Sequence, residues 1–300
     1  MKLRRHLYVS DLDGTLLDER GGLSDRTKKG LVALLKQDVD FTVASARSYS
    51  SIKSIFGDFP FRLPIIEFNG GFITDYATGE HIETNALESS LATEVFDQVV
   101  KSGQRPFVST FNGREDCLYY DELINTAMLW YENRRRRAKD RRLRRTRDLR
   151  ATMQEQVVSM TVMAQSEASI SALKNDLEAR YGERLKLYSY ENAYSLGSWW
   201  LTIHAERASK HIALLTLRDR FLPGARITAM GDNFNDLDML RVADHAIAVE
   251  NAVPALQQIA HRVVGHHRTD SVVRFMEDEV RKRSALDFFV PPEAPCPIIP

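Results

Sequence analysis

Short apolar runs alternate with amphipathic segments over the first eighty residues and again after about residue 201. The apolar runs span three to five residues and are followed by glycine, serine or polar residues, which is typical of buried strands. The segments between them repeat apolar residues at helical spacing, as Leu31, Leu34 and Leu35 do after the candidate N-cap Ser24. Strands that alternate with helices predict a parallel sheet covered by helices. The predicted strands are residues 7–10, 40–44, 64–68, 226–230, 246–249 and 262–264, and the predicted helices are residues 24–37, 48–56, 208–221, 235–241, 254–260 and 270–282.

The pattern between residues 81 and 200 is different, because longer strands and helices follow one another without strict alternation. A hairpin is expected at residues 71–74 and 80–84, with its turn at Ala77-Thr78-Gly79. Further on, we expect helices at residues 88–102, from 121 onward and at 167–181, and strands at 106–110, 117–120, 157–164, 185–190 and 199–203. This layout predicts an α+β domain inserted into the first one. The predicted organisation is a core at 1–80 and 201–290, an inserted domain at 81–200 and a proline-rich tail at 291–300.

Composition narrows the class of protein. Three hundred residues with 43% hydrophobic content suffice for two domains with real cores. No run approaches the 18 apolar residues that a membrane span needs, so no membrane association is expected. The first six residues lead into a strand without the apolar stretch of a signal peptide, and Cys117 and Cys296 are the two cysteines. Both features fit a reducing cytoplasm, and we expect a cytoplasmic protein.

The net charge is zero, but one segment is strongly basic. Residues 134–150 hold eleven Lys or Arg and two Asp, a net charge of +9. This run allows a solvated extended helix, recruitment of a polyanionic substrate or acidic partner, or nucleic-acid binding. Nucleic-acid binding stays one of the alternatives, but no other feature of the segment supports it. Aromatic residues do not interleave with the arginines, and no known nucleic-acid-binding motif occurs.

Acidic residues follow two of the predicted strands of the core. Asp11 and Asp13 come directly after the first strand, and Asp232 and Asp236 follow the strand at 226–230. Carboxylates crowded at strand ends are costly unless a cation neutralises them. Oxygen ligands of this kind suit Mg²⁺, which shares its coordination sphere with substrate phosphates.

Two motifs carry a family resemblance. Asp-Leu-Asp-Gly-Thr at 11–15 and Gly-Asp-Asn-Phe-Asn-Asp at 231–236, each after an apolar strand, resemble the haloacid dehalogenase-like (HAD) hydrolase superfamily. The resemblance spans about residues 5 to 280, and the Cof-type branch with its large inserted cap fits best. It implies a Rossmann-like doubly wound parallel sheet with an inserted α+β cap domain. It also implies that Asp11 is the nucleophile that forms an aspartyl-phosphate, and that Asp13 is the acid and then the base.

The same resemblance assigns roles around the phosphoryl group. Asp232 is expected to ligate Mg²⁺ with Asp11 and the main-chain carbonyl of Asp13. Lys210, which opens the helix after the cap, is expected to neutralise phosphoryl charge. The family's Thr-Gly-Arg motif stands here as Ser45-Ala46-Arg47, so the backbone is less free at the middle residue. Ser45 is a donor to a phosphoryl oxygen or a helix N-cap, and Arg47 contacts substrate or pairs with a surface acid.

Further residues match supporting positions of the family. Those expected to line or support the pocket are Asn69, Gly70, Asn235, Asp236 and Asn251. One ring of Trp199-Trp200 could wall a sugar pocket, but packing within the cap is the favoured interpretation. For His204, too, a packed or solvated position is favoured.

These features predict a Mg²⁺-dependent phosphatase of a small phosphorylated metabolite, with sugar or polyol phosphates as the commonest family substrates and a biosynthetic intermediate as another candidate. Cap closure would exclude water during the first step, and cap residues would select the substrate. One alternative is a phosphomutase of the same superfamily. Another is a binding protein that holds RNA or an acidic partner on its arginine-rich segment. The sequence leaves the substrate and the oligomeric state open.

Overall fold

A computed structural model describes residues 5–192 and 195–287 of the chain. The predicted proline-rich tail at 291–300, together with Cys296, lies outside these residues. Within them, no helix is both long and apolar enough to cross a membrane. Cys117 is buried and has a free thiol.

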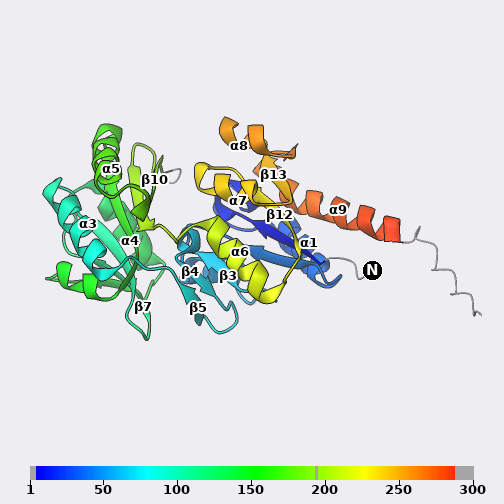
Figure 1. The fold of residues 1–300 in the computed structure, drawn as a ribbon, viewed down its shortest axis with the longest axis horizontal. Helices are drawn as coiled ribbons and strands as arrows, with labels where there is room; N and C mark the ends of the chain where they lie inside the picture. The colour runs from blue at the N-terminus through cyan, green and yellow to red at the C-terminus, as the bar shows by residue number, and fades with distance from the viewer. Residues whose placement is uncertain (1–4, 193–194, 288–300) are drawn as a thin grey trace, which may run out of the picture.

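A five-stranded parallel sheet forms the core on the right of Figure 1, in the order β14-β13-β12-β1-β2. Its strands are β1 (His6–Ser10), β2 (Asp40–Val43), β12 (Arg226–Gly231), β13 (His245–Val249) and β14 (Arg262–Val264). Strand β1 pairs in parallel with β2 and with β12, the central strand, so residues from the two ends of the chain meet in the sheet. Apolar strand residues such as Leu7 and Ile227 are fully buried, as expected for a sheet covered on both faces.

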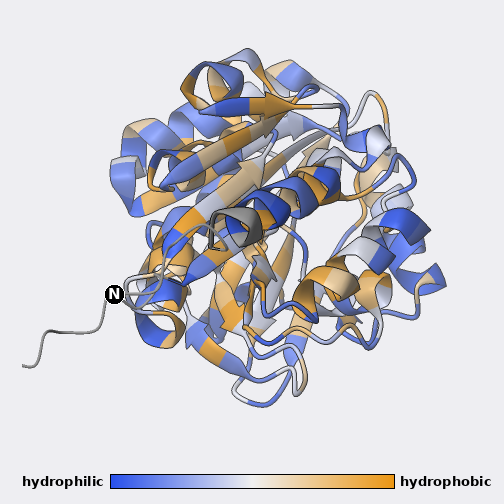
Figure 2. Ribbon diagram, turned by 90° about the vertical axis from the view of Figure 1, so that its right-hand side faces the viewer, coloured by the Kyte–Doolittle hydropathy of each residue, from blue (hydrophilic) through white to orange (hydrophobic). Residues whose placement is uncertain are grey.

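The helices of the core fall into two groups. The core helices are α1 (Asp25–Leu35), α2 (Tyr49–Phe56), α6 (Lys210–Phe221), α7 (Leu237–Arg241), α8 (Pro254–Ile259) and α9 (Ser271–Asp287). The first and last of them, α1 and α9, pack together, and α7 packs against both α6 and α8. Figure 2 shows their hydrophilic outer faces around an apolar sheet. Ser24 caps α1, since its side chain accepts the amide of Thr27, and this N-cap prediction is confirmed.

The strand predicted at 64–68 does not extend the core sheet as expected. It is β3 (Ile65–Glu67), which forms an antiparallel three-stranded sheet with β4 (Phe72–Thr74) and β5 (His81–Thr84). A single parallel bridge between Ala44 and Ile66 joins it to the core. Strand β4 follows after a short turn and pairs with β3 as its antiparallel hairpin partner.

A second, six-stranded sheet lies on the left of Figure 1, in the order β10-β11-β9-β6-β7-β8. Its strands are β6 (Pro106–Phe111), β7 (Asp116–Tyr120), β8 (Leu143–Arg145), β9 (Gln156–Ala164), β10 (Leu185–Glu191) and β11 (Trp199–Ala205), and its helices are α3 (Ser89–Lys101), α4 (Thr126–Arg137) and α5 (Glu167–Tyr181). Apolar residues of α3 and α5 cover one face of the sheet, and α4 covers part of the other.

This second sheet lies between β5 and α6 in the chain. The predicted fold class, a Rossmann-like α/β core with an inserted α+β cap domain, is therefore confirmed. The boundaries expected at residues 80/81 and 200/201 remain predictions. Short helical turns complete the described chain at Leu12–Leu16, Phe68–Gly70, Arg150–Gln154, Gly182–Arg184, Phe234–Asp236 and His267–Thr269.

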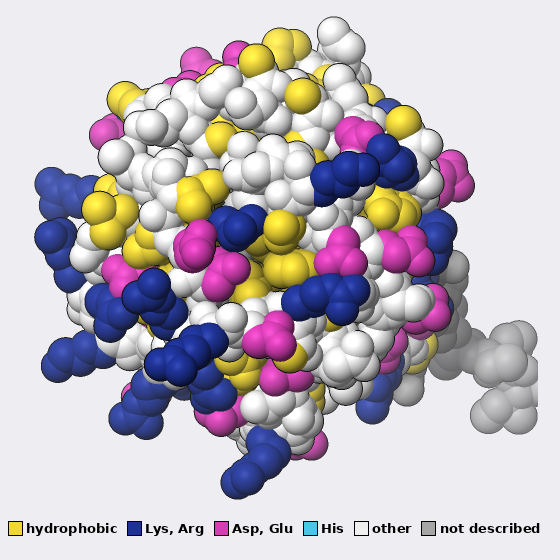
Figure 3. Space-filling view, turned by 90° about the vertical axis from the view of Figure 1, so that its left-hand side faces the viewer, with side chains coloured by type: hydrophobic (Ala, Val, Ile, Leu, Met, Phe, Trp, Pro, Cys, Tyr) yellow, Lys and Arg dark blue, Asp and Glu magenta, His cyan; other side chains and the backbone are white. Residues whose placement is uncertain are grey.

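The arginine-rich segment is not an extended helix. Helix α4 begins at Thr126, five residues later than predicted, and ends at Arg137, after which the chain turns and forms β8. Buried Arg142 donates two hydrogen bonds to Asp140, and the next residue, Leu143, packs against the apolar cluster under α4, so helical spacing breaks down. Other pairs on this segment are Arg136–Glu132, Arg144–Glu115 and Arg150–Asp97. Figure 3 shows the basic side chains gathered on one side of the cap surface with acidic side chains among them.

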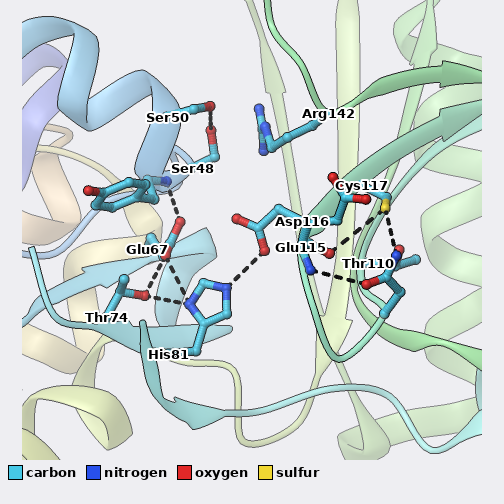
Figure 4. Close-up of polar contacts among 12 residues, drawn as sticks. Ser48, Ser50, Glu67, Thr74, His81, Thr110, Glu115, Asp116, Cys117 and Arg142 are labelled. Carbon is cyan, nitrogen blue, oxygen red and sulfur yellow. Dashed lines mark hydrogen bonds and ion pairs between the residues drawn. The ribbon is translucent and has the colours of Figure 1, made fainter. Parts of the chain in front are cut away.

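A buried polar cluster lies where the three-stranded sheet meets the cap sheet (Figure 4). Glu67 on β3 is fully buried and accepts hydrogen bonds from the main chain of Tyr49 and from the hydroxyl of Thr74. The imidazole of His81 lies 3.7 Å from Glu67 and pairs on its other side with Asp116 of β7 at 2.8 Å. A chain of polar contacts therefore connects the core side of the joint to the cap.

Candidate active site

Three carboxylates meet at the carboxyl end of the core sheet. Asp11 follows β1, and Asp232 and Asp236 follow β12, so the pairing of these two strands brings them together. One oxygen atom of each lies within 4.8 Å of the others. Gly14 turns the first loop with φ +76°, and a Cβ there would come within 2.4 Å of Asp232, so this close approach requires glycine.

Lys210 lies inside this cluster. Its ammonium donates to Asp11 at 2.5 Å and to Asp236 at 2.7 Å, and its side chain is fully buried. It is the first residue of α6, which begins directly after the cap returns to the core. Asp236 is in turn fixed by the amides of Asp232 and Asn233, which donate to its second oxygen. From the sequence only a supporting role was expected for Asp236, but in the structure it is a full member of the cluster.

The titration of these groups reflects burial and crowding. Burial raises the pKa of Asp11 well above its usual range; Lys210 opposes this, while Asp236 and Asp232 add to it. Burial and then Asp236 raise the pKa of Asp232 to about 7. Burial lowers the pKa of Lys210, but Asp11 and Asp236 outweigh it and hold it above its ordinary value. A lysine alone does not neutralise three carboxylates, so the set has the oxygen donors and the excess negative charge that a divalent cation needs.

Asp13 points away from the other carboxylates. The guanidinium of Arg47 binds both of its oxygens, at 2.7 and 2.6 Å. Arg47 therefore pairs with a carboxylate of the site and not with a surface acid, and its contact with a substrate stays a prediction. Both side chains line the same cavity as Asp11.

The loops after β2 and β3 complete the floor of the site. Ser45 is buried, and its hydroxyl accepts the amide of Arg47. Since α2 is capped at Ser48, the N-cap alternative for Ser45 is wrong. Asn69 accepts a hydrogen bond from Asn235 at 3.0 Å, and both line the cavity. Gly70, with φ +98°, lies so close to Ser209 that a Cβ would be 2.5 Å from its carbonyl oxygen.

Asn251 lies behind the site and connects two loops. Its amide donates to the carbonyl of Gly14 at 2.8 Å, and its side-chain oxygen accepts the amide of His267. Asn251 does not line the cavity. It contacts the loop that carries Asp13.

A cavity of about 870 Å³ lies between the carboxylates and the cap sheet. Its cap wall contains Trp200, Thr202 and His204 of β11, which share one face of the strand, while Leu201, Ile203 and Ala205 face α5. From the sequence, packing within the cap was favoured for Trp200, and a packed or solvated position for His204. Strict alternation along 200–205 was the signal that could have placed them on a second, polar face.

The comparisons with known proteins agree with this geometry. The sequence model of the haloacid dehalogenase-like hydrolases matches residues 8–276. The chain is 26% identical to the 5-amino-6-(5-phospho-D-ribitylamino)uracil phosphatase YitU of Bacillus subtilis, with 93% of this chain and 98% of that protein covered. It is 23% identical to a second B. subtilis phosphatase of the same name, YwtE, with coverage of 89% and 95%. A solved haloacid dehalogenase-like hydrolase from B. subtilis superposes with a TM-score of 0.74 at 19% identity, covering 90% of this chain and 98% of that one.

Proposed function

The chain belongs to the haloacid dehalogenase-like hydrolases and is a phosphatase; from this premise we propose that it requires Mg²⁺ and hydrolyses a small phosphorylated metabolite, a sugar or polyol phosphate. The observation that carries the proposal is the buried contact of Lys210 with Asp11 at the base of the cavity. An anionic phosphoryl group repels an attacking carboxylate unless positive charge lies beside both groups. The ammonium group of Lys210 provides such a charge next to Asp11.

Asp11 and Asp232 would hold the ion, with Asp236 beside them and the main-chain carbonyl of Asp13 as the family pattern implies. When bound, Mg²⁺ supplies charge that keeps the carboxylates ionised and neutralises phosphoryl oxygens. Lys210 adds a second positive charge through its contact with Asp11 at 2.5 Å.

In the first step, a carboxylate oxygen of Asp11 attacks phosphorus and the bond to the leaving oxygen breaks, which gives an aspartyl-phosphate and an alcohol. Asp13 donates the proton that the leaving oxygen needs. In the second step, Asp13 takes a proton from water, the water oxygen bonds to phosphorus, and Asp11 is released with inorganic phosphate. The guanidinium of Arg47 occupies both oxygens of Asp13, so one of these contacts has to open when Asp13 exchanges a proton with the substrate.

The cavity supports a small polar substrate. Its wall combines hydroxyl groups of Ser109, Ser159, Thr161 and Thr202 with the aromatic rings of Trp130, Tyr131, Tyr188, Tyr190 and Trp200. Two relatives are named for a substrate that joins a phosphorylated ribityl chain to a uracil ring. Hydroxyl groups would suit such a chain and aromatic side chains such a ring, so this intermediate is the first substrate to test.

The test is release of inorganic phosphate, with Mg²⁺ or with chelator, from sugar, polyol, nucleotide and cofactor phosphates. We expect metal-dependent release from a few of them, with polyol phosphates among the best. Equal release in excess chelator would refute the Mg²⁺ requirement. Phosphate that moves to a second hydroxyl of the substrate instead of appearing in solution would identify a phosphomutase.

A further inference from the structure

Three buried polar atoms of one strand have no hydrogen-bond partner among residues 5–192 and 195–287. They are Trp200 Nε1, Thr202 Oγ1 and His204 Nε2, and each residue is at least nine-tenths buried. All three residues line the cavity. A buried polar atom without a partner is costly, and such atoms in a cavity wall mark the places where a ligand forms hydrogen bonds.

The hydrogen-bonding character of each atom follows from its surroundings. His204 Nδ1 lies 3.1 Å from the carbonyl oxygen of Val158, so Nδ1 carries the hydrogen and Nε2 is an acceptor. Burial lowers the pKa of His204 to about 4, so the ring stays neutral near pH 7. Trp200 Nε1 can only donate, whereas the Thr202 hydroxyl can do both. The three positions span about 13 Å, since a strand rises about 3.3 Å per residue.

The two ends of this row differ. At the His204 end, Val158 packs against Phe68, the residue before Asn69 in the core loop. At the Trp200 end, the indole packs edge-on to Tyr131, with 5.2 Å between ring centroids. The guanidinium of Arg135 lies over the ring of Tyr131, with 4.7 Å between its central carbon and the ring centroid. The Nε of Arg135 also has no hydrogen-bond partner among the described residues. The Trp200 end therefore offers two N–H donors beside aromatic rings.

We propose that Trp200, Thr202 and His204 determine substrate specificity by binding an extended leaving group. Its chain carries a hydroxyl or N–H that donates to His204 and a hydroxyl that reaches Thr202. Its far end is a planar ring with carbonyl oxygens that accept from Trp200 and Arg135. This assignment rests on the proposed phosphatase function and excludes short esters such as triose phosphates as preferred substrates, because they cannot span the row.

The test compares kcat/KM for 5-amino-6-(5-phospho-D-ribitylamino)uracil, D-ribitol 5-phosphate and 4-nitrophenyl phosphate, with Mg²⁺ present. The variants are Trp200→Phe, Thr202→Val and His204→Phe, each of which removes one polar group and keeps most of the volume. For each, the ratio of kcat/KM for the ring-bearing ester to that for 4-nitrophenyl phosphate should fall about tenfold, the effect of one lost buried hydrogen bond. Trp200→Phe should leave the ratio for ribitol 5-phosphate closer to wild type than His204→Phe does.

Tyr8→Phe is the matched control, since the Tyr8 hydroxyl on β1 is also buried without a partner among the described residues but is not part of the cavity wall. Its ratios should equal those of the wild type. Unchanged ratios in all three cavity variants would show that water satisfies these atoms and would overturn the inference. Wild-type turnover of 4-nitrophenyl phosphate but of neither long ester would overturn it and leave the phosphatase intact. No release from any ester would overturn the proposed function as well.

Discussion

Replacing Glu67 by glutamine should change how the stability of the protein depends on pH. Burial is the main reason that the pKa of Glu67 is raised from 4.5 to about 7. Nearby Asp116 adds to this, while Thr74, His81 and the Tyr49 amide oppose it. The folded state binds the proton of Glu67 more tightly than the unfolded state does, so protonation of Glu67 stabilises the fold. This contribution to the free energy of unfolding is fully present below pH 4.5 and is lost as the pH rises through 7. One pKa unit is worth about 1.36 kcal/mol, so the loss amounts to about 3 kcal/mol.

Glutamine does not ionise and therefore escapes this loss. The difference in unfolding free energy between Glu67→Gln and wild type should shift in favour of the variant by about 3 kcal/mol between pH 4.5 and pH 8. A hydrogen bond lost from Tyr49 or Thr74 would move the whole curve without changing its slope, since neither donor titrates in this range. Urea unfolding at half-unit steps of pH measures the difference.

Glu94→Gln is the control, because Glu94 is exposed on α3 and its replacement should give a profile parallel to wild type. Parallel profiles for Glu67→Gln, within about 0.5 kcal/mol, would refute the argument that burial keeps Glu67 protonated near neutral pH. They would mean that water or the pair of His81 and Asp116 compensates the buried charge.

Three further predictions test the site and the arginine-rich segment. Asp11→Asn should lower kcat at least about a thousandfold, because the nucleophile is lost, while circular dichroism stays native; kcat near wild type would exclude Asp11 as nucleophile. Lys210→Met leaves two buried carboxylates without their ammonium partner, so urea unfolding should show a loss of about 3–5 kcal/mol together with reduced phosphate release; unchanged stability would contradict the buried contact. Arg142→Gln, which leaves buried Asp140 without its fork, should cost about 3 kcal/mol, whereas Arg137→Gln on the exposed helix end should stay within about 0.5 kcal/mol; equal effects would contradict their different burial.

The sequence predicted most elements because their signals are local. Helix α5 was predicted at its observed bounds, and Ser24 was identified as a cap from the residues that follow it. The family resemblance placed Asp11 together with Lys210 and Asp232, although about two hundred residues separate Asp11 from the other two. Parallel strands meet at one edge, so once β1 and β12 were expected in one sheet, their following residues had to be neighbours.

Other features depend on contacts that no local pattern encodes. The arginine run looked like one solvated helix, but Asp140 and Arg142 pair as buried groups and end the helical spacing. Contact with a substrate and pairing with a surface acid were both open for Arg47, and only the approach of two loops showed that it binds Asp13. The same holds for His204 and Trp200. Their alternation was visible along the strand, but which face of the strand meets a cavity is decided by how the cap lies over the core.

The amino-acid sequence by itself therefore determined the family, the acidic residues expected at the site and most of the helices and strands, because periodicity, caps and short motifs are properties of neighbouring residues. The tertiary structure decided which charges neutralise one another and which polar atoms remain for a ligand. Burial and distance set these energies, and both arise only when segments remote in the chain are packed together.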